Sequence, residues 1–247
     1  MKSVPIALVL VHGVGLDHMM WQPVVAALPH RRTITYDMIG HGTAGKPTGP
    51  YSLFTFVDQL SNIVDAIGGE VDLVGFSMGA LVAEGFAMSS GGQRIRRMVL
   101  LNGVHHRSSA ERRAITDRVA EVRAGGFEAT VEPALQRWFT PEFRTEHPTE
   151  VTKVRQRLLA NDVRAYADAY EVFALADAEV SGRVSEISAP TLVATGSDDQ
   201  RSTPAMAAAL AQALPSGRAN VLPGLRHLTP IEAPAVVASM IDEFTAH

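Results

Sequence analysis

The sequence contains no cysteine among its 247 residues. This absence excludes disulfide bridges, thiolate nucleophiles, and metal or iron–sulfur sites built on cysteine. Basic residues are not in excess either, because 22 Lys and Arg stand against 26 Asp and Glu and no basic block occurs. The net charge of −4 therefore gives no indication of a nucleic-acid partner.

Long hydrophobic runs are also missing. No apolar stretch approaches the roughly 18 residues of a membrane-spanning helix. The apolar run 4–11 is short and no cleavage site of small residues follows it, so it is typical of a buried strand and not of a signal peptide. We expect a cytoplasmic protein without a membrane partner. With 46% hydrophobic and 19% charged residues, the composition suits one sizeable domain, or a core with an inserted subdomain.

Short apolar runs rich in β-branched residues recur along the chain, and turn signals and helical patterns separate them. These runs are residues 6–11, 33–36, 71–74, 98–101, 191–194 and 219–222. Continuous apolar strands that alternate with helices predict an α/β fold, with a mostly parallel sheet of about six strands flanked by helices. In such sheets, functional residues gather at the carboxyl ends of the strands.

Residues 105–182 have a different character. They lack convincing strands, their helical patterns are interrupted at Pro133, Pro141 and Pro148, and they carry 11 of the 22 Lys and Arg. We predict a helical cap inserted after the fourth strand, between core segments 1–104 and 183–247. The alternative is a set of helices packed on the edge of the sheet.

The pentapeptide GFSMG at residues 75–79 lies between an apolar run and a helical pattern. A serine between two glycines at a strand-to-helix junction is typical of a nucleophile elbow, because the tight turn leaves no room for flanking side chains. The turn exposes the hydroxyl of Ser77 above the sheet edge. It also aims the backbone N–H of Met78 at the place where an oxyanion forms.

A serine hydroxyl needs a base that removes its proton and an acid that orients the base. His227 lies in the loop after the last predicted strand and fits the role of the base better than the eight other histidines. The acid is expected at a strand end between serine and histidine. The fourth strand ends in Asn102, which carries no charge, and the fifth is followed by two carboxylates, Asp198 and Asp199.

Together these motifs make the chain resemble the α/β-hydrolases over almost its whole length. The matching segments are 12–13 (HG), 37–47 (DMIGHGTAGKP), 75–79 (GFSMG), 190–204 with Gly196, Asp199 and Thr203-Pro204, and 223–234 with His227 and Glu232-Ala233-Pro234. The resemblance implies the α/β-hydrolase fold, Asp199 as the acid of a Ser77–His227–Asp199 triad, and an oxyanion hole formed by the N–H groups of Val14 and Met78. It implies no cofactor and no metal.

Within this family, the chain is most similar to 3-oxoadipate enol-lactonases and related small carboxylesterases. The segments that carry this similarity are 12–15 (HGVG), Met20-Trp21 and 137–143 (RWFTPEF). The resemblance implies a serine esterase or lactonase that acts on a small ester or lactone, in the degradation of aromatic compounds. A carboxylate on the substrate would need a cation in a dry pocket. We therefore expect Arg137 or Arg226 to bind the substrate, beside Trp21 and Trp138.

Other functions fit the same residues. The triad could hydrolyse a C–C or amide-type bond in a ring-cleavage product, or the fold could be a non-catalytic ligand-binding protein. Two features depart from the family pattern: no β-hairpin precedes the first strand, which predicts an exposed sheet edge and a possible homo-oligomer, and Arg226 replaces a usually small residue before the histidine.

Overall fold

The computed structural model describes residues 5–246, so residues 1–4 and 247 of the predicted core lie outside the described residues. Its centre is a six-stranded sheet with the strand order β2-β1-β3-β4-β5-β6, and every neighbouring pair is parallel. The strands are β1 (Ala7–Val11), β2 (Arg32–Thr35), β3 (Val71–Phe76), β4 (Ile95–Leu101), β5 (Thr191–Gly196) and β6 (Gly217–Leu222). Each of the six predicted strands is present, and β2 and β6 form the two edges.

Side chains of the strands alternate between two hydrophobic cores, as the two-residue period of a strand requires. In β1, Ala7, Val9 and Val11 face one core, and Leu8 and Leu10 face the other; all five are buried. Burial on both faces explains why β1 is continuously apolar in sequence, whereas the edge strands β2 and β6, which are more exposed, are not.

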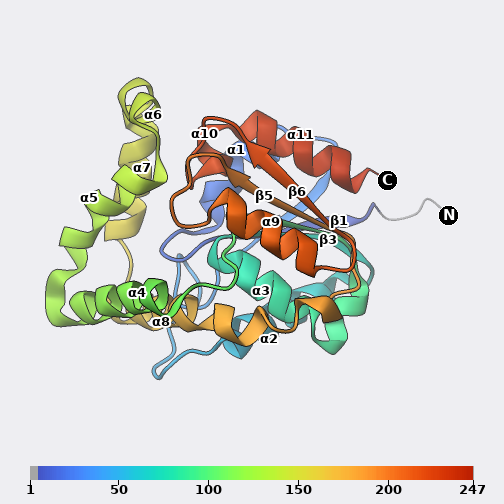
Figure 1. Ribbon diagram of the computed structural model, residues 1–247, viewed down its shortest axis with the longest axis horizontal. Coiled ribbons are helices and arrows are strands. Elements are labelled where there is room, and N and C mark those ends of the chain that lie inside the picture. The colour runs from blue at the N-terminus through green and yellow to red at the C-terminus, as the bar shows by residue number, and fades with distance from the viewer. Residues whose placement is uncertain (1–4, 247) are drawn as a thin grey trace.

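Helices cover both faces of this sheet (Figure 1). One core is covered by α2 (Leu53–Ile67), α3 (Met78–Ala87), α8 (Val163–Val180) and α9 (Pro204–Ala213). The other is covered by α1 (Gln22–Ala26) and α11 (Pro234–Thr245), with the short α10 (Thr229–Glu232) beside them. Within residues 5–246, no helix is both long and apolar enough to span a lipid bilayer.

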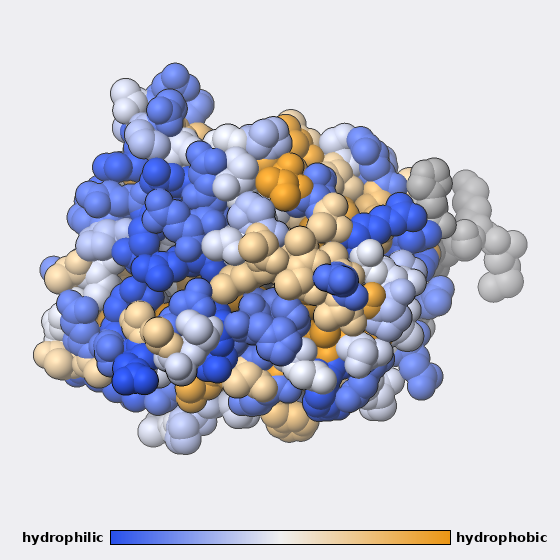
Figure 2. All heavy atoms as spheres, in the orientation of Figure 1, coloured by the Kyte–Doolittle hydropathy of each residue, from blue (hydrophilic) through white to orange (hydrophobic). Residues whose placement is uncertain are grey.

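Between β4 and β5 the chain is helical. It forms α4 (Ser109–Glu121), a π-helical turn (Val122–Gly126), α5 (Phe127–Trp138), α6 (Pro141–Glu146), α7 (Pro148–Leu159) and α8. In Figure 1, α4 to α7 lie to one side of the sheet, whereas α8 runs back toward α3. Helix α4 packs against α8, and α5 packs against α7. The surface over them is largely hydrophilic (Figure 2). We call residues 105–182 the helical segment.

The predicted break at Pro133 is wrong, whereas Pro141 and Pro148 do begin helices. Pro133 lies inside α5 on its exposed side, and the buried Val131 and Leu135 hold the helix across the lost hydrogen bond. The break comes earlier, at Gly125, whose φ of 95° favours glycine.

A buried carboxylate, Asp72 in β3, ties the sheet to the C-terminal helix. Its Oδ2 accepts hydrogen bonds from Nη2 of Arg31 and Nη2 of Arg96, each at 2.7 Å. Arg31 also donates to Asp242 and Thr245 of α11. Because Asp72 is completely buried, its charge depends on these two arginines.

We predict that Asp72→Asn lowers the free energy of unfolding by about 3 kcal/mol, because the substitution removes the buried carboxylate that pairs with both arginines. The matched control is Asp65→Asn, since the Asp65 side chain is 69% exposed where it pairs with Arg94, and its loss should cost less than about 1 kcal/mol. Urea unfolding of both variants measures the difference. Equal losses would contradict a structural role for the Asp72 cluster.

Candidate active site

Ser77 occupies the turn between β3 and α3 with a strained backbone. Its φ of 54° and ψ of −114° are unusual for a residue with a side chain. A hydrogen bond from the N–H of Ser77 to the carbonyl of Leu101, 2.8 Å long, holds the turn against β4. The strain therefore lies at the serine that the sequence identifies as a nucleophile.

Steric crowding requires glycine two residues before and two residues after Ser77. A Cβ atom added to Gly75 would lie 2.3 Å from the carbonyl oxygen of Gly79, and one added to Gly79 would lie 2.4 Å from that of Val11. Both distances are too short for any side chain, so the turn packs backbone directly against backbone. This is the physical reason for the pentapeptide that stands out in the sequence.

The side chain of His227 lies between Ser77 and Asp199. Its Nε2 is 3.1 Å from the Oγ of Ser77, and its Nδ1 is 2.7 Å from Oδ2 of Asp199. All three residues are buried, with 5%, 8% and 4% exposure for Ser77, His227 and Asp199. A carboxylate accepts hydrogen bonds only, so Nδ1 carries the proton and Nε2 is free to accept one from the serine hydroxyl.

The carboxylate of Asp199 is held from several sides. Oδ1 accepts hydrogen bonds from the N–H groups of Arg201 and Ser202, and Oδ2 accepts a further one from the amide of Asn102. Burial by itself would raise the pKa of Asp199, but the charge and hydrogen bond of His227 and the N–H groups of Ser202 and Arg201 outweigh it and lower that pKa. Asp199 is therefore charged at neutral pH.

Asn102 contributes to the site in a way that sequence reasoning missed. It ends β4 in a left-handed conformation, with a φ of 50°, and is completely buried. Its amide donates to Asp199, and its Oδ1 accepts a hydrogen bond from the hydroxyl of Thr229, 2.6 Å long. The position of Asn102 directly after an apolar strand was the one feature of the sequence that could have indicated a role in the site.

The loop that carries His227 is anchored to the helical segment. The N–H of Leu228 donates to the carbonyl of Trp138, and the indole ring of Trp138 lies 6.1 Å from the imidazole of His227. Glu232 accepts hydrogen bonds from the N–H groups of Arg226 and Thr140. The end of α5 and the histidine loop therefore hold each other in place.

The loop after β1 lies directly against the serine. A Cβ atom added to Gly13 would come within 3.0 Å of the Phe76 ring and 3.3 Å of the Ser77 Cβ. Val14 follows in this loop and lines the same cleft as Ser77, while Met78 begins α3. The two residues predicted to form an oxyanion hole thus lie on elements that meet at Ser77.

A cleft opens over Ser77 and His227, and the helical segment forms part of its wall. Arg137 and Trp138, both expected to bind the substrate, line this cleft. Sequence reasoning missed three further arginines on its wall, which are Arg107, Arg118 and Arg201. For Arg107 and Arg118, the only indication in the sequence was that residues 105–182 carry half of the Lys and Arg. For Arg201, it was the position two residues after Asp199.

Carboxylates in the cleft wall do not balance these arginines. The lining acids are Glu111 and Asp199, so four arginines leave an excess of two positive charges. Glu111 is held by Ser108 in the capping box that begins α4, and Asp199 is held by His227. Burial and the neighbouring Arg118 lower the pKa of Arg137, which is the response of a cation without enough counter-charge.

Trp21 and Arg226, which the sequence placed among the candidate substrate-binding residues, do not line this cleft. Trp21 is completely buried in the core below the cleft, where its ring packs edge-on against Phe76. The guanidinium of Arg226 donates to the carbonyls of Gln136 and Phe139 at the C-terminal end of α5. Burial of the large apolar ring of Trp21 is favourable, so it lies in the core. The negative end of the α5 dipole attracts the guanidinium of Arg226.

Among residues 5–246, no three His, Asp or Glu side chains lie close enough together to hold a metal ion. The arrangement around Ser77 contains instead a hydroxyl, a base and an acid in hydrogen-bonded series. Such a series can generate an alkoxide-like nucleophile through proton transfer.

Residues 8–240 match the model of the alpha/beta hydrolase family. The chain belongs to this family. Its relatives include the (E)-2-((N-methylformamido)methylene)succinate hydrolase of Acinetobacter baylyi, 33% identical over 93% of this chain and 86% of that protein. The 3-oxoadipate enol-lactonase 2 of the same organism is 30% identical over 92% of this chain and 84% of that protein.

A solved structure, the enol-lactonase from Burkholderia xenovorans LB400, has the same fold. It superimposes with a TM-score of 0.91 at 29% identity and covers 99% of this chain and 93% of its own. The predicted α/β-hydrolase fold and the similarity to enol-lactonases are therefore confirmed.

The geometry predicts different effects for the two neighbouring carboxylates. Asp199→Asn should lower kcat for 4-nitrophenyl butyrate by about 10⁴-fold, because an amide in place of the carboxylate favours the wrong tautomer of His227. Asp198→Asn is the matched control and should change kcat less than about threefold, since Asp198 is exposed and its carboxylate accepts a hydrogen bond from the adjacent Ser197 hydroxyl and not from His227. The reverse ranking in steady-state assays would contradict the placement of the acid.

Proposed function

We propose that this protein is a serine hydrolase that cleaves a small carboxylic ester or lactone through a Ser77–His227–Asp199 triad. The observation that carries the proposal is the position of His227, whose Nε2 faces the Ser77 hydroxyl while its Nδ1 faces a charged carboxylate. Membership of a hydrolase family and the relatedness to lactonases support it.

In this mechanism, the Oγ of Ser77 attacks the carbonyl carbon while Nε2 of His227 takes its proton. The tetrahedral intermediate collapses as the bond to the leaving oxygen breaks, and His227 returns the proton to that oxygen. Water, deprotonated by His227, then attacks the acyl carbon. The bond between this carbon and Oγ breaks, His227 returns the proton to Oγ, and the acid leaves. Asp199 remains ionised throughout and stabilises the imidazolium.

The N–H groups of Val14 and Met78 are proposed to bind the oxyanion of the intermediate. The N–H of Met78 belongs to the first turn of α3, where backbone donors and the helix dipole favour negative charge. A donor of this kind contributes about 3–4 kcal/mol to the stability of the transition state.

The substrate is proposed to carry a carboxylate in addition to its scissile bond. Four arginines and an excess of two positive charges line the cleft, and Arg137 comes from the same turn of α5 as Trp138, which approaches His227. The name of one relative places a succinate, with its two carboxylates, in that protein's substrate. A guanidinium can pair with a carboxylate through two parallel hydrogen bonds.

The same relative favours one alternative reaction. Its name includes a formamido group, so hydrolysis of an amide-type bond by the same three residues is the second candidate. A cap function for residues 105–182 and a role in the degradation of aromatic compounds stay predictions.

Ser77→Ala is expected to reduce turnover of 4-nitrophenyl butyrate by about 10⁶-fold, because the nucleophile is lost. A fluorophosphonate probe should label the wild-type protein at Ser77, as shown by peptide mass spectrometry, and should not label the variant. Retention of more than about a tenth of the activity in Ser77→Ala would refute the acyl-enzyme mechanism.

We expect Arg137→Ala to lower kcat/KM more for a charged ester than for a neutral one. We expect its kcat/KM for mono-4-nitrophenyl succinate to fall about 30- to 100-fold more than its kcat/KM for 4-nitrophenyl butyrate, because a charge-assisted hydrogen bond contributes about 2–3 kcal/mol. Arg226→Ala is the matched control: its guanidinium caps α5, so the ratio of the two rates should remain unchanged. An unchanged ratio in Arg137→Ala would exclude Arg137 as the carboxylate ligand.

A further inference from the structure

The loop between β1 and the 3₁₀ turn at His18–Trp21 makes a tight turn around Val14. The N–H of Leu16 donates to the carbonyl of Gly13 at 3.2 Å, which closes the turn, and Gly15 has a φ of 78°. A Cβ atom at Gly15 would lie 2.9 Å from Leu158 and 2.8 Å from Tyr166. Both of those side chains belong to the helical segment, so the segment packs directly on the turn that presents Val14.

Asn161, in the link between α7 and α8, bonds to this turn. Its Nδ2 donates to the carbonyl of Gly15 at 2.8 Å and to the carbonyl of Leu158 at 2.9 Å. Asn161 is buried, with an exposed fraction of 7% for the whole residue. The amide therefore joins the C-terminal end of α7 to the residue that follows Val14.

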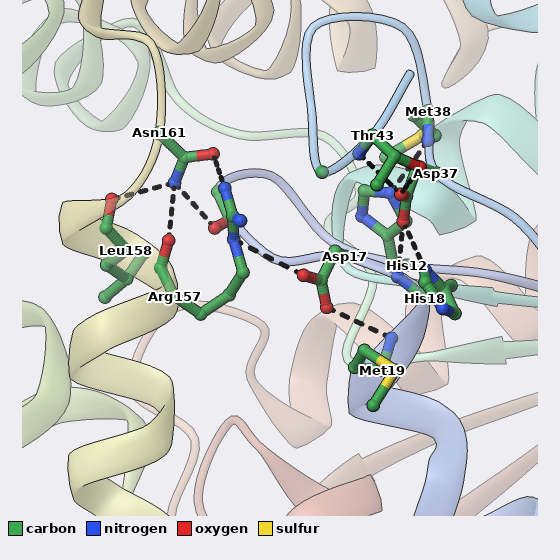
Figure 3. A network of polar contacts seen from close by, with 12 residues as sticks. His12, Asp17, His18, Met19, Asp37, Met38, Thr43, Arg157, Leu158 and Asn161 are labelled. Carbon is green, nitrogen blue, oxygen red and sulfur yellow. Dashed lines mark hydrogen bonds and ion pairs between the residues drawn. The ribbon is translucent and has the colours of Figure 1, made fainter.

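Arg157 fixes the orientation of the Asn161 amide. Its Nη2 donates to Oδ1 of Asn161 at 2.6 Å, and its Nε lies 3.6 Å from a carboxylate oxygen of Asp17 (Figure 3). A guanidinium only donates hydrogen bonds, so Oδ1 must face Arg157 and the NH₂ group must face Gly15. Asp17 in turn accepts from the N–H of Met19, which ties the far end of the same loop into the network.

The opposite side of the loop has its own anchor. Nε2 of His12 accepts a hydrogen bond from the N–H of Met38 at 2.9 Å, and its Nδ1 lies 2.8 Å from the carbonyl of Gly13 (Figure 3). Burial and the neighbouring His41 lower the pKa of His12 to about 3, so this anchor is neutral at physiological pH. Val14 is thus flanked by a core anchor at Gly13 and a helical-segment anchor at Gly15.

We infer that Asn161 is a positioning residue that fixes the backbone N–H of Val14 in the orientation needed to stabilise the oxyanion. The inference rests on the proposed function, because it assigns Val14 an oxyanion. Without the Asn161 amide, the Gly15 carbonyl would lose a buried partner, and the peptide groups around Val14 could rotate about the permissive glycine. The helical segment would then contribute to catalysis through the oxyanion hole as well as through the cleft wall.

The test compares Asn161→Ala, Asn161→Asp and the control Asp162→Ala with the wild-type protein. Asp162 caps α8 by accepting a hydrogen bond from the N–H of Ala165, one residue away from Asn161, and does not bond to Gly15. Asn161→Asp keeps the side-chain size and the partner of Arg157, but turns an acceptor toward the Gly15 carbonyl. Hydrolysis of 4-nitrophenyl butyrate and inhibition by phenylboronic acid, whose tetrahedral adduct mimics the oxyanion, are measured.

We expect both Asn161 variants to lose about ten- to a hundredfold in kcat with KM changed less than about threefold, since small displacements of catalytic groups have effects of this size. Phenylboronic acid should bind more weakly by a similar factor. Asp162→Ala should retain kcat and boronate affinity within about threefold, even though it loses a helix cap.

Three results would overturn the inference: an Asp162→Ala loss that equals that of Asn161→Ala, unchanged boronate affinity in the Asn161 variants, or full kcat in Asn161→Asp. If Asn161→Ala does not fold, the comparison is made with Asn161→Asp. Fluorophosphonate labelling of the wild-type protein distinguishes a failure of the proposed function from a failure of the role of Asn161. A wild-type protein that is neither labelled at Ser77 nor active contradicts the proposed function, whereas an active wild type with equally active variants contradicts the role of Asn161 alone.

Discussion

The strained turn at Ser77 is the constraint on which the rest of the structure depends. A φ of 54° places its hydroxyl above the sheet, and it can do so only because Gly75 and Gly79 allow backbone to pack on backbone. Strain of this kind persists only where surrounding structure enforces it. Here the enforcing structure is the centre of a parallel sheet, with β1 and β4 on either side of β3.

Around this turn, the proposed active site is assembled from three separate parts of the chain. The core supplies Ser77 after β3 and Asp199 after β5, on either side of β4, and the last loop supplies His227. The helical segment supplies three of the four arginines of the cleft wall and the contacts that hold the His227 loop. The excess of arginine in this cleft supports the proposal of an anionic substrate, because burial strengthens each charge–charge contact.

The helical segment also shows how polar groups outside the chemistry can support it. Arg226 was expected to bind the substrate, yet it caps the end of α5, while Asn161 and Arg157 bond to the loop of Val14. Both contacts join the segment to a loop of the proposed site. The segment therefore contacts the loops of the proposed site also through side chains that do not line the cleft.

The sequence by itself determined the parallel α/β sheet, the elbow at Ser77 and the order of serine, acid and histidine, because these depend on local pattern and on glycine sterics. It left the choice between Asp198 and Asp199 to family resemblance, and it could not place Arg137, Arg226 or Trp21. Only the tertiary structure decided that Asp199 faces His227, that Arg137 lines the cleft and that Trp21 is buried. The direction of a side chain in a loop or cap depends on partners distant in sequence, such as Asn102 for Asp199 and the carbonyls of α5 for Arg226.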